Sequence, residues 1–355
     1  MELNDRMPLR YRGITWLMAL LGFVVMAISI WGCAAGQRPP ESGKAPAAGQ
    51  EGKDDRILVV TTIFPYYDFV RQIAGDRVKL KLVVPAGMDS HSFEPTPADM
   101  IAMQEADVLI CNGGEMEQWV EKVLGSLDTS HMKVLTMMDY VDVVEEEHVE
   151  GMEEEEEHRH EDGFEMHIEY DEHIWTSPVN ARAIVKIISQ TLSEAAPREK
   201  SRFEDNTQAY LKELKELDSQ FRQVVNQGRL HMIVVADKFP FRYFADEYGL
   251  SYRAAFSGCS GDTEPSARTI AYLIDKVKED RIPAVYYLEL SSHRTAEIIQ
   301  ESEIDEIIPP GRRVLLTLNS RKANIFDPET TKSLMKGIKN STDIPRDEAG
   351  REVSG

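Results

Sequence analysis

The sequence has little positive charge. Its 355 residues include 40 lysines and arginines against 61 aspartates and glutamates, which gives a formal net charge of -21. Nucleic-acid binding needs clustered basic side chains, so this deficit argues against a nucleic-acid partner. An acidic surface attracts cations instead. The length is sufficient for two domains with substantial cores.

Cysteines and catalytic motifs are also scarce. Of the three cysteines, Cys33 lies near the N-terminus, which leaves only Cys111 and Cys259 for the rest of the chain. These two could pair in an oxidising compartment, but we interpret them as buried small apolar side chains. The sequence contains no HExxH motif and no nucleophile elbow, and no residue stands out as a general base. It therefore offers no direct sign of an enzyme.

The N-terminal residues have the pattern of a targeting segment. Basic residues precede an apolar run over 14–30, which ends close to Gly32 and Cys33. This pattern predicts a signal peptide over 1–33. The Gly-Cys pair resembles a lipobox, in which Cys33 is lipidated and becomes the first mature residue. A plain membrane-anchor helix is the alternative, because the run approaches the ~18 residues that a span requires. Residues 34–55, rich in Gly, Ala and Pro, predict a flexible tether.

From residue 56 onward, short apolar runs alternate with helical patterns. This alternation predicts a parallel α/β sheet over 56–178, and it returns over 229–340 as a second lobe, followed by a tail over 341–355. The strands are predicted over 57–62, 78–84, 108–111, 134–136, 232–236, 284–289 and 314–318. The helices are predicted over 67–74, from 96–97 onward, and over 119–124, 179–195, 242–248 and 267–279.

A long helix is predicted between the two lobes, within residues 179–228. It starts at Pro197 and runs to about Gln227, with apolar residues at helical spacing, and Gly228 ends it. About 30 residues at 1.5 Å per residue give a length of ~45 Å, which exceeds one small domain. We therefore predict an α/β protein in which one long rigid helix joins two parallel-sheet lobes.

Two histidines stand at positions where ligands of α/β sheets gather. His91 follows the predicted strand 78–84, in a loop over 85–97 that contains three prolines. His173 lies just before the predicted helix 179–195. Ligands of open α/β sheets bind beyond the C-terminal ends of the strands, and neutral imidazole is a good zinc ligand. A histidine considered alone also has many structural roles.

Several motifs resemble the metal-binding subunits of zinc and manganese ABC importers. They lie within residues 57–320, at 61–65, 75–78, 85–97, 106–108, 112–115 and 173–181. An acidic, histidine-rich insert before the second histidine is similar to the zinc-type members. The resemblance implies two α/β lobes joined by a rigid helix, with the metal in the cleft between them. It also implies that His91 and His173 are the two ligands from the first lobe.

The second lobe departs from the family pattern. Lys238 falls where the family has His or Glu, and a protonated lysine has no lone pair for a metal. Asp237, one residue earlier, is the nearest substitute, unless it pairs with Lys238 or Arg242. The fourth family ligand falls near Asn319, a weaker donor, and Glu289 could replace it, unless it has a capping or structural role. The predicted ligands are therefore His91, His173, Asp237 and Glu289.

The acidic insert breaks the α/β alternation. Residues 145–173 hold 15 acidic residues and five histidines, with almost no apolar periodicity. Such a segment cannot bury enough surface to offset its ordering entropy, so we predict a mobile surface loop over 145–172. It is either a solvated run of charge or a loop that gathers zinc near the cleft. In the second case the gathering side chains are His148, His158, His160 and His167.

Together these features predict a monomeric, lipid-anchored receptor on the extracytoplasmic side of the membrane. It would capture a divalent transition metal, zinc or alternatively manganese, and deliver it to the permease and ATPase of an ABC importer. Two histidines and a carboxylate also form a catalytic zinc set, so a zinc-dependent hydrolase is one alternative. A lipid-anchored metal-buffering adhesin without transport is another.

Overall fold

The computed structural model describes residues 54–85, 87–153, 169–260, 264–288 and 291–302, and the backbone of 314–316. The chain divides into two units, Met1–Asp54 and Asp55–Gly355, and the following description concerns the second. Among the described residues, no helix combines the length and apolar character of a membrane span. Some residues singled out above lie outside this part, namely Cys33, His158, His160, His167, Glu289 and Asn319.

The first lobe is built on a four-stranded parallel sheet with the order β2-β1-β3-β4. Its strands are β1 (Leu58–Thr61), β2 (Lys79–Leu82), β3 (Val108–Cys111) and β4 (Lys133–Thr136). The two central strands are apolar along their length, and Val59, Val60 and Leu109 are fully buried. Continuous apolar runs of this kind are expected where helices cover both faces of a parallel sheet.

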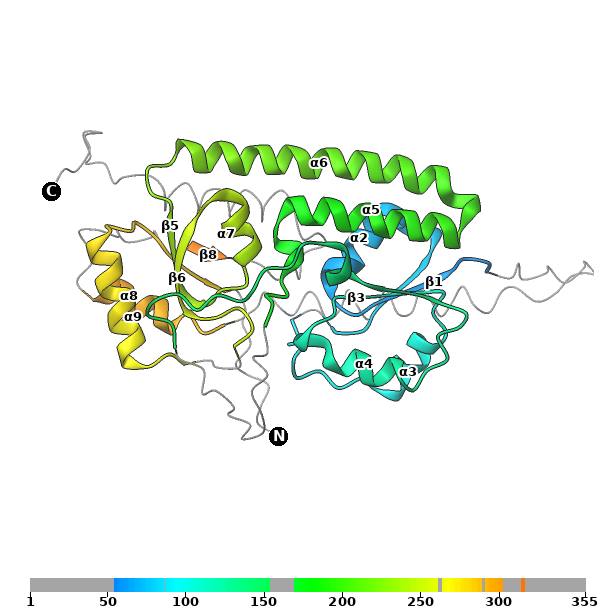
Figure 1. Ribbon diagram of the computed structural model, residues 1–355, viewed down its shortest axis with the longest axis horizontal. Helices are drawn as coiled ribbons and strands as arrows, with labels where there is room; N and C mark the ends of the chain where they lie inside the picture. The colour runs from blue at the N-terminus through cyan, green and yellow to red at the C-terminus, as the bar shows by residue number, and fades with distance from the viewer. Residues whose placement is uncertain are drawn as a thin grey trace, which may run out of the picture. The chain divides into compact units, whose positions relative to one another are not determined.

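Helices cover both faces of this sheet. Figure 1 shows α2 (Phe64–Ala74) and α5 (Pro178–Ala195) on one side, and α3 (Pro97–Gln104) and α4 (Gln118–Leu124) on the other. Thr96 begins α3 with a capping box, because its side chain accepts the N–H of Asp99 and the Asp99 side chain accepts the N–H of Thr96. The loop containing His91 is thus fixed between β2 and a capped helix.

The second lobe repeats the design with the strand order β6-β5-β7-β8. Its strands are β5 (Met232–Lys238), β6 (Ser251–Phe256), β7 (Val285–Leu288) and β8 (Val314–Leu316), all parallel. Its helices are α7 (Arg242–Tyr248), α8 (Ala267–Glu279) and α9 (Arg294–Glu301). Strand β6 and helix α9 were not predicted from the sequence. The other predicted elements correspond to observed ones within the described residues.

The long helix α6 (Lys200–Gln227) joins the two lobes. At 28 residues it spans about 42 Å. Its first half buries Phe203, Tyr210 and Leu214 in the core of the first lobe. Its second half buries Leu217, Phe221 and Val225 in a core of the second lobe. One apolar stripe therefore serves two cores, and the predicted fold class is confirmed.

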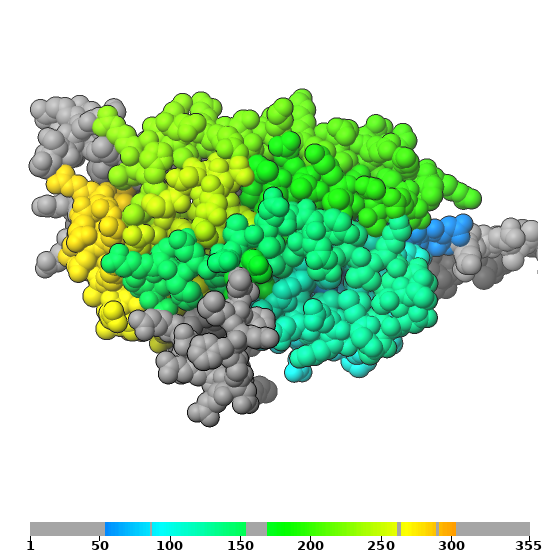
Figure 2. Space-filling view, viewed as in Figure 1, coloured from blue at the N-terminus to red at the C-terminus, as the bar shows by residue number. Residues whose placement is uncertain are grey.

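The acidic insert was expected to be a mobile surface loop, but its described residues pack partly against the second lobe. Glu145 forms an antiparallel bridge with Tyr170, and the N–H of Glu153 donates to the carbonyl of Ala255 at 2.9 Å. Val149 and Met152 pack against a core of the second lobe. In Figure 2 this green segment lies on the yellow-green atoms of that lobe. Val149 and Met152 thus anchor the first part of the insert, residues 145–153, to the second lobe although most of its side chains are charged.

Candidate metal centre

Three possible metal ligands gather where the two lobes meet. The ligand atoms of His91, Glu172 and Cys259 all lie within 4.8 Å of one another. His91 comes from the loop after β2, Glu172 from the segment before α5, and Cys259 from the loop after β6. Histidine nitrogen, carboxylate oxygen and cysteine sulfur are all ordinary zinc ligands. The group therefore combines donors from both sheets.

His91 is held by its own loop and faces mixed charge. Its backbone N–H donates to Oδ1 of Asp89 at 3.1 Å. Although the residue is exposed, the protein atoms around its ring desolvate the imidazole and lower the pKa of His91, and the charges of His173 and Lys238 act in the same direction. The neutral ring that a metal requires is therefore favoured. The same charges place His173 and Lys238 near His91.

His173 adjoins this group and is oriented by a carboxylate. Oδ1 of Asp171 lies 3.2 Å from Nδ1 of His173. Burial would lower the pKa of His173, but the charge and hydrogen bond of Asp171, together with the charges of Glu172 and Glu146, outweigh it and raise that pKa. With Nδ1 turned toward Asp171, Nε2 is the nitrogen left for a metal. Carboxylate partners of this kind fix the ring orientation of metal-binding histidines.

Glu172 is a buried carboxylate tied to the loop after β3. Its Oε2 accepts the N–H of Met116 at 2.8 Å, and its Oε1 accepts the N–H of Glu115. Gly114 leaves the space for it, since a Cβ there would lie 2.2 Å from Oε1 of Glu172. Burial raises the pKa of Glu172 to about 7. A carboxylate offers about four lone-pair sites, so these two bonds leave capacity for a metal.

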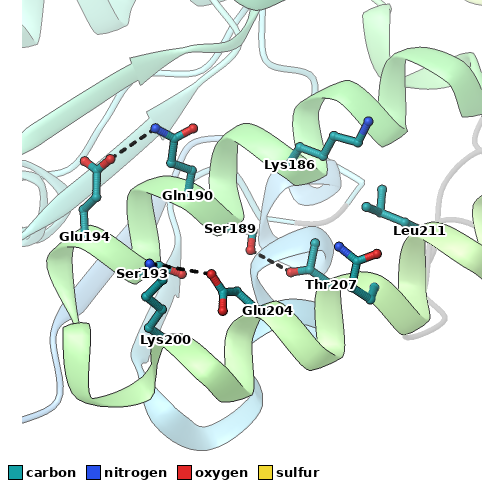
Figure 3. A pocket seen from close by; sticks show the side chains of 10 residues that line it. Lys186, Ser189, Gln190, Ser193, Glu194, Lys200, Glu204, Thr207 and Leu211 are labelled. Atoms are coloured by element: carbon teal, nitrogen blue, oxygen red, sulfur yellow. Dashed lines mark hydrogen bonds and ion pairs between the residues drawn. The ribbon is translucent and has the colours of Figure 1, made fainter.

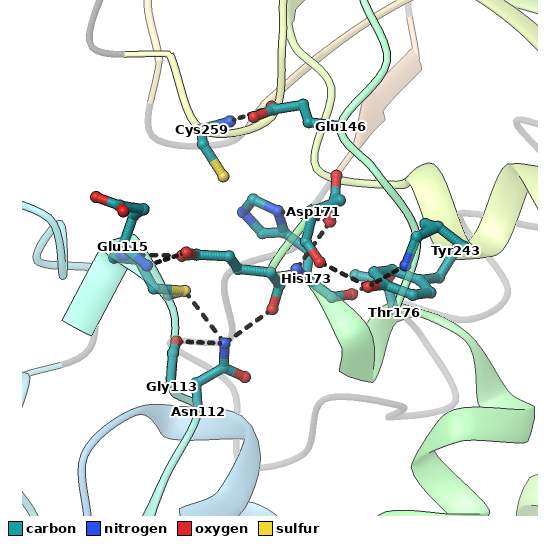
Figure 4. Close-up of polar contacts among 12 residues, drawn as sticks. Asn112, Gly113, Glu115, Glu146, Asp171, His173, Thr176, Tyr243 and Cys259 are labelled. Atoms are coloured by element: carbon teal, nitrogen blue, oxygen red, sulfur yellow. Dashed lines mark hydrogen bonds and ion pairs between the residues drawn. The ribbon is translucent and has the colours of Figure 1, made fainter. Parts of the chain in front are cut away.

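Asn112, at the end of β3, also connects the loop after β3 to the segment that carries Glu172 (Figure 4). Its Nδ2 donates to the backbone carbonyl of Glu172 at 3.0 Å, and its Oδ1 accepts the hydroxyl of Tyr66. Its backbone N–H donates to Oε2 of Glu117 at 2.6 Å. Asn112 is fully buried. Satisfied buried polar networks rigidify their surroundings, which here includes the backbone that carries Glu172 and His173.

Cys259 is fixed by the stem of the acidic insert. Its backbone N–H donates to Oε1 of Glu146 at 3.0 Å. The preceding Gly258 approaches the first lobe so closely that an added Cβ would lie 3.3 Å from Cε1 of His173. Burial, together with nearby carboxylates, raises the pKa of the Cys259 thiol. Both Cys259 and Cys111 are free thiols, so the disulfide considered above is not formed.

Asp237 stands at the C-terminal end of β5, as predicted, but lies outside the group of three. Its Oδ1 accepts the N–H of Lys238 at 2.8 Å, and its Oδ2 accepts the N–H of Leu288 at 3.2 Å. These bonds connect the ends of β5 and β7. The proposed partner Arg242 forms ion pairs with Glu147 and Asp246. A role of Asp237 in metal binding stays a prediction, as does that of Glu289.

Glu172 and Cys259 were not predicted from the sequence as site residues. Glu172 stands directly before His173, but it is one of fifteen acidic residues in the segment 145–173, so its position alone did not distinguish it from the others. Cys259 follows β6, a strand whose small residues Ala254 and Ala255 gave no β-branched run. The available signal was the pair of glycines around Cys259, since a Gly-rich turn after a strand is where α/β ligands bind.

A separate hollow lies between α5 and α6 (Figure 3). It is lined by ten residues of the two helices, including Ser189 and Thr207, which hydrogen-bond to each other at 2.7 Å. Lys200 and Glu204 form an ion pair on the same surface. None of His91, Glu172 and Cys259 lines it. Its polar groups largely pair among themselves, so it is not a candidate for the metal centre.

The two-lobed fold is that of the periplasmic metal-binding proteins. Residues 59–322 match the family described as zinc-uptake complex component A, periplasmic, and the chain belongs to this family. It is 32% identical over 299 residues to the zinc-binding lipoprotein AdcA of Streptococcus pneumoniae (strain ATCC BAA-255 / R6), with 83% of this chain covered. It spans only 58% of that relative's length.

Two further similarities agree with this family. The high-affinity zinc uptake system protein ZnuA of Bacillus subtilis is 32% identical over 249 residues, which is 70% of this chain and 76% of that protein. The crystal structure of the Zn(II)-bound ZnuA-like domain of Streptococcus pneumoniae AdcA matches with a TM-score of 0.60 at 27% identity, covering 80% of this chain and 99% of that one. The predicted family resemblance is therefore confirmed.

Proposed function

We propose that this protein captures zinc outside the cytoplasm and delivers it to the permease and ATPase of an ABC importer. The observation that carries the proposal is the meeting of three donor side chains from two lobes within 4.8 Å. A site between lobes can close on an ion and open to release it, as hinged binding proteins do. The zinc-binding names of the relatives AdcA and ZnuA support the choice of metal.

In this proposal His91 and His173 are the ligands from the first lobe. His91 carries a depressed pKa and is therefore largely neutral near pH 7. His173 presents Nε2 because Asp171 faces its Nδ1. Carboxylates nearby, among them Glu172 and Glu115, make the surroundings attractive to a divalent cation. Manganese remains the alternative cargo, and titration against both metals distinguishes them.

The lipid anchor and the placement outside the cytoplasm belong to the same proposal. Lipidation of Cys33 would tether the folded lobes to the outer face of the membrane through residues 34–55, and the lobes would act as a monomer. The pattern of charge, apolar run and Gly-Cys pair in the first 33 residues supports this. The wild type should incorporate labelled fatty acid and a Cys33→Ser variant should not, whereas a wild type that incorporates none would contradict lipid anchoring.

The acidic insert is proposed to gather zinc near the site. Its residues 154–168 contain seven acidic side chains and the three histidines His158, His160 and His167. Weak ligands of this kind raise the local cation concentration, an effect that salt reduces. Deleting 154–168 retains the packed stem, and should slow zinc uptake only when zinc is scarce. Unchanged uptake under scarcity would leave the insert, including His148 in its stem, as a solvated run of charge.

Transport is tested in cells that lack the endogenous receptor. The full chain should restore growth and zinc accumulation in zinc-depleted medium when its cognate permease and ATPase are present, and a His91→Ala variant should not. The exposed His131, on a turn before β4, offers a matched His131→Ala control. Restoration without the permease would support a buffering adhesin, and hydrolytic activity that depends on His91 would support the enzyme alternative.

A further inference from the structure

The second lobe lacks an obvious donor at the position expected from the family. Lys238 stands there, and its positive charge repels a cation. The neighbouring Asp237 lies outside the group formed by His91, Glu172 and Cys259, and its oxygens accept the backbone N–H groups of Lys238 and Leu288. Among the described residues, Cys259 is the metal-ligating side chain of this lobe that groups with His91 and Glu172. Its sulfur is therefore either a metal ligand or part of a structural cysteine.

Cys259 has few features of a structural cysteine. It is not disulfide-bonded, and it is only partly buried. Its surroundings are polar, because the carboxylates of Glu146, Glu172 and Asp171 all lie near its sulfur. Cys111 provides the contrast, since it is buried in the first sheet at 3% exposure. A thiol among carboxylates gains little from apolar packing, which is the usual reason for an unpaired cysteine in a core.

The backbone around Cys259 holds the sulfur toward the site. Glu146 accepts the N–H of Cys259, and Gly258 approaches His173 so closely that an added Cβ would lie 3.3 Å from Cε1 of that residue. In Figure 4 the sulfur points toward the imidazole of His173. An added Cβ at 258 would also lie 3.0 Å from the carbonyl oxygen of Phe239 and 3.2 Å from Oδ2 of Asp171, so a larger residue would fit only if these neighbours shifted. Several contacts thus fix one geometry.

We propose that Cys259 is the metal ligand of the second lobe, binding as a thiolate, and that its sulfur makes the site prefer zinc to manganese. This inference rests on the proposed function of zinc capture. On binding, the S–H bond breaks, the proton passes to solvent and a zinc–sulfur bond forms. Thiolate is a soft ligand that suits zinc, whereas manganese prefers oxygen donors. The chain would thereby replace the missing family ligand with a more selective one.

The test uses the full chain in detergent, with Cys33→Ser in every sample so that only two cysteines remain. Zinc and manganese are each titrated alone against wild type, Cys259→Ser, Cys259→Asp and the control Cys111→Ala. Loss of an outer-shell partner costs about 10–100-fold in affinity, so loss of a direct ligand in Cys259→Ser should weaken zinc by at least about 100-fold. Cys259→Asp should lower the zinc-to-manganese affinity ratio by about tenfold or more.

Cobalt provides a direct spectroscopic readout of a metal–sulfur bond. Bound Co²⁺ should give the intense near-ultraviolet charge-transfer band of a cobalt–thiolate bond in wild type and Cys111→Ala, and should lose it in Cys259→Ser. Absence of the band in wild type, with unchanged zinc affinity in Cys259→Ser, would overturn the role of Cys259. If zinc still binds through His91 in that case, the proposed function stands. If wild type binds no zinc, both proposals fail.

Discussion

Oδ1 of Asp171 accepts the backbone N–H of His173 at 2.8 Å and also lies 3.2 Å from Nδ1 of the same residue. One carboxylate oxygen thus fixes both the backbone and the ring of His173. Tyr243 of the second lobe donates its hydroxyl to the backbone carbonyl of Asp171 at 2.6 Å. The orientation of a first-lobe histidine therefore depends on a contact with the second lobe.

Asp171→Asn should weaken zinc binding by about tenfold, the lower end of the range for outer-shell partners. The amide can still accept a hydrogen bond but no longer raises the basicity of the ring. Equilibrium titration with a competing chelator measures the effect. Asp205, exposed on α6, provides the control Asp205→Asn. Equal zinc affinities for wild type and Asp171→Asn would contradict the proposed role of Asp171 in zinc binding.

Gly114→Ala should displace the side chain of Glu172. Gly114 has a φ of 81°, which disfavours any other residue, and a Cβ there would lie 2.2 Å from Oε1 of Glu172. We expect a loss of about 1–3 kcal/mol in the free energy of unfolding and about tenfold weaker zinc binding through the displaced carboxylate. Urea unfolding and zinc titration measure the two effects.

Gly125 offers a matched control for this substitution. It lies in the right-handed helical region with a φ of −62°, and an added Cβ would make ordinary contacts no closer than 3.4 Å. Gly125→Ala should therefore be nearly neutral in both measurements. If Gly114→Ala behaves like Gly125→Ala, the close packing of Gly114 against Glu172 does not matter in solution.

Glu117 should make stability depend on pH. It is 1% exposed, and burial raises its pKa from 4.5 to about 7. The folded state therefore holds a proton that the unfolded state has released, so its stabilising contribution is full below about pH 4.5 and is lost as the pH rises through about 7. The loss amounts to on the order of 3 kcal/mol at 1.36 kcal/mol per pKa unit.

Urea unfolding at pH 4.5 and pH 8 tests this effect. Glu117→Gln cannot ionise, so the difference in unfolding free energy between wild type and the variant should shift by on the order of 3 kcal/mol, in favour of the variant at high pH. The exposed Glu121 on α4 gives the control Glu121→Gln. Parallel pH profiles for wild type and Glu117→Gln would refute the raised pKa.

Lys238 should oppose metal binding through its charge. Its charge lowers the pKa of His91, so it acts at the site itself. Removing it in Lys238→Gln should tighten zinc binding by about fivefold, corresponding to about 1 kcal/mol, the interaction of two unit charges about 4 Å apart when water screens them fully. The gain should shrink at high ionic strength. Lys215→Gln, on the exposed face of α6, should show no gain, and the same absence in Lys238→Gln would contradict the electrostatic argument.

The fold could largely be predicted from the sequence because its signals are local. Apolar runs such as 108–111 and the apolar stripe along α6 indicate buried strands and helix faces directly. Thr96 followed by Pro97 indicates the start of α3. The strand β6 was missed because small residues carry a weak periodic signal. The packed stem of the acidic insert was missed because its packing depends on only two apolar side chains, Val149 and Met152, within a segment that is otherwise mostly charged.

The candidate site was harder to predict because it combines segments far apart in the chain. His91 and His173 could be singled out from their loops and motifs. Cys259 lies 168 positions after His91, and only the packing of the lobes brings its sulfur near the imidazole. Asp237 fitted the strand-end rule, yet its oxygens bond to the backbone of β5 and the end of β7. Such partners depend on tertiary structure.

The most direct test of the account is zinc bound at equilibrium to the purified full chain, measured by elemental analysis after dialysis against a zinc buffer. The account predicts one tightly held zinc per chain for wild type and for His131→Ala, and a large loss of it for His91→Ala and His173→Ala. A wild-type protein that stays free of zinc, or histidine variants that hold zinc as well as wild type, would contradict it.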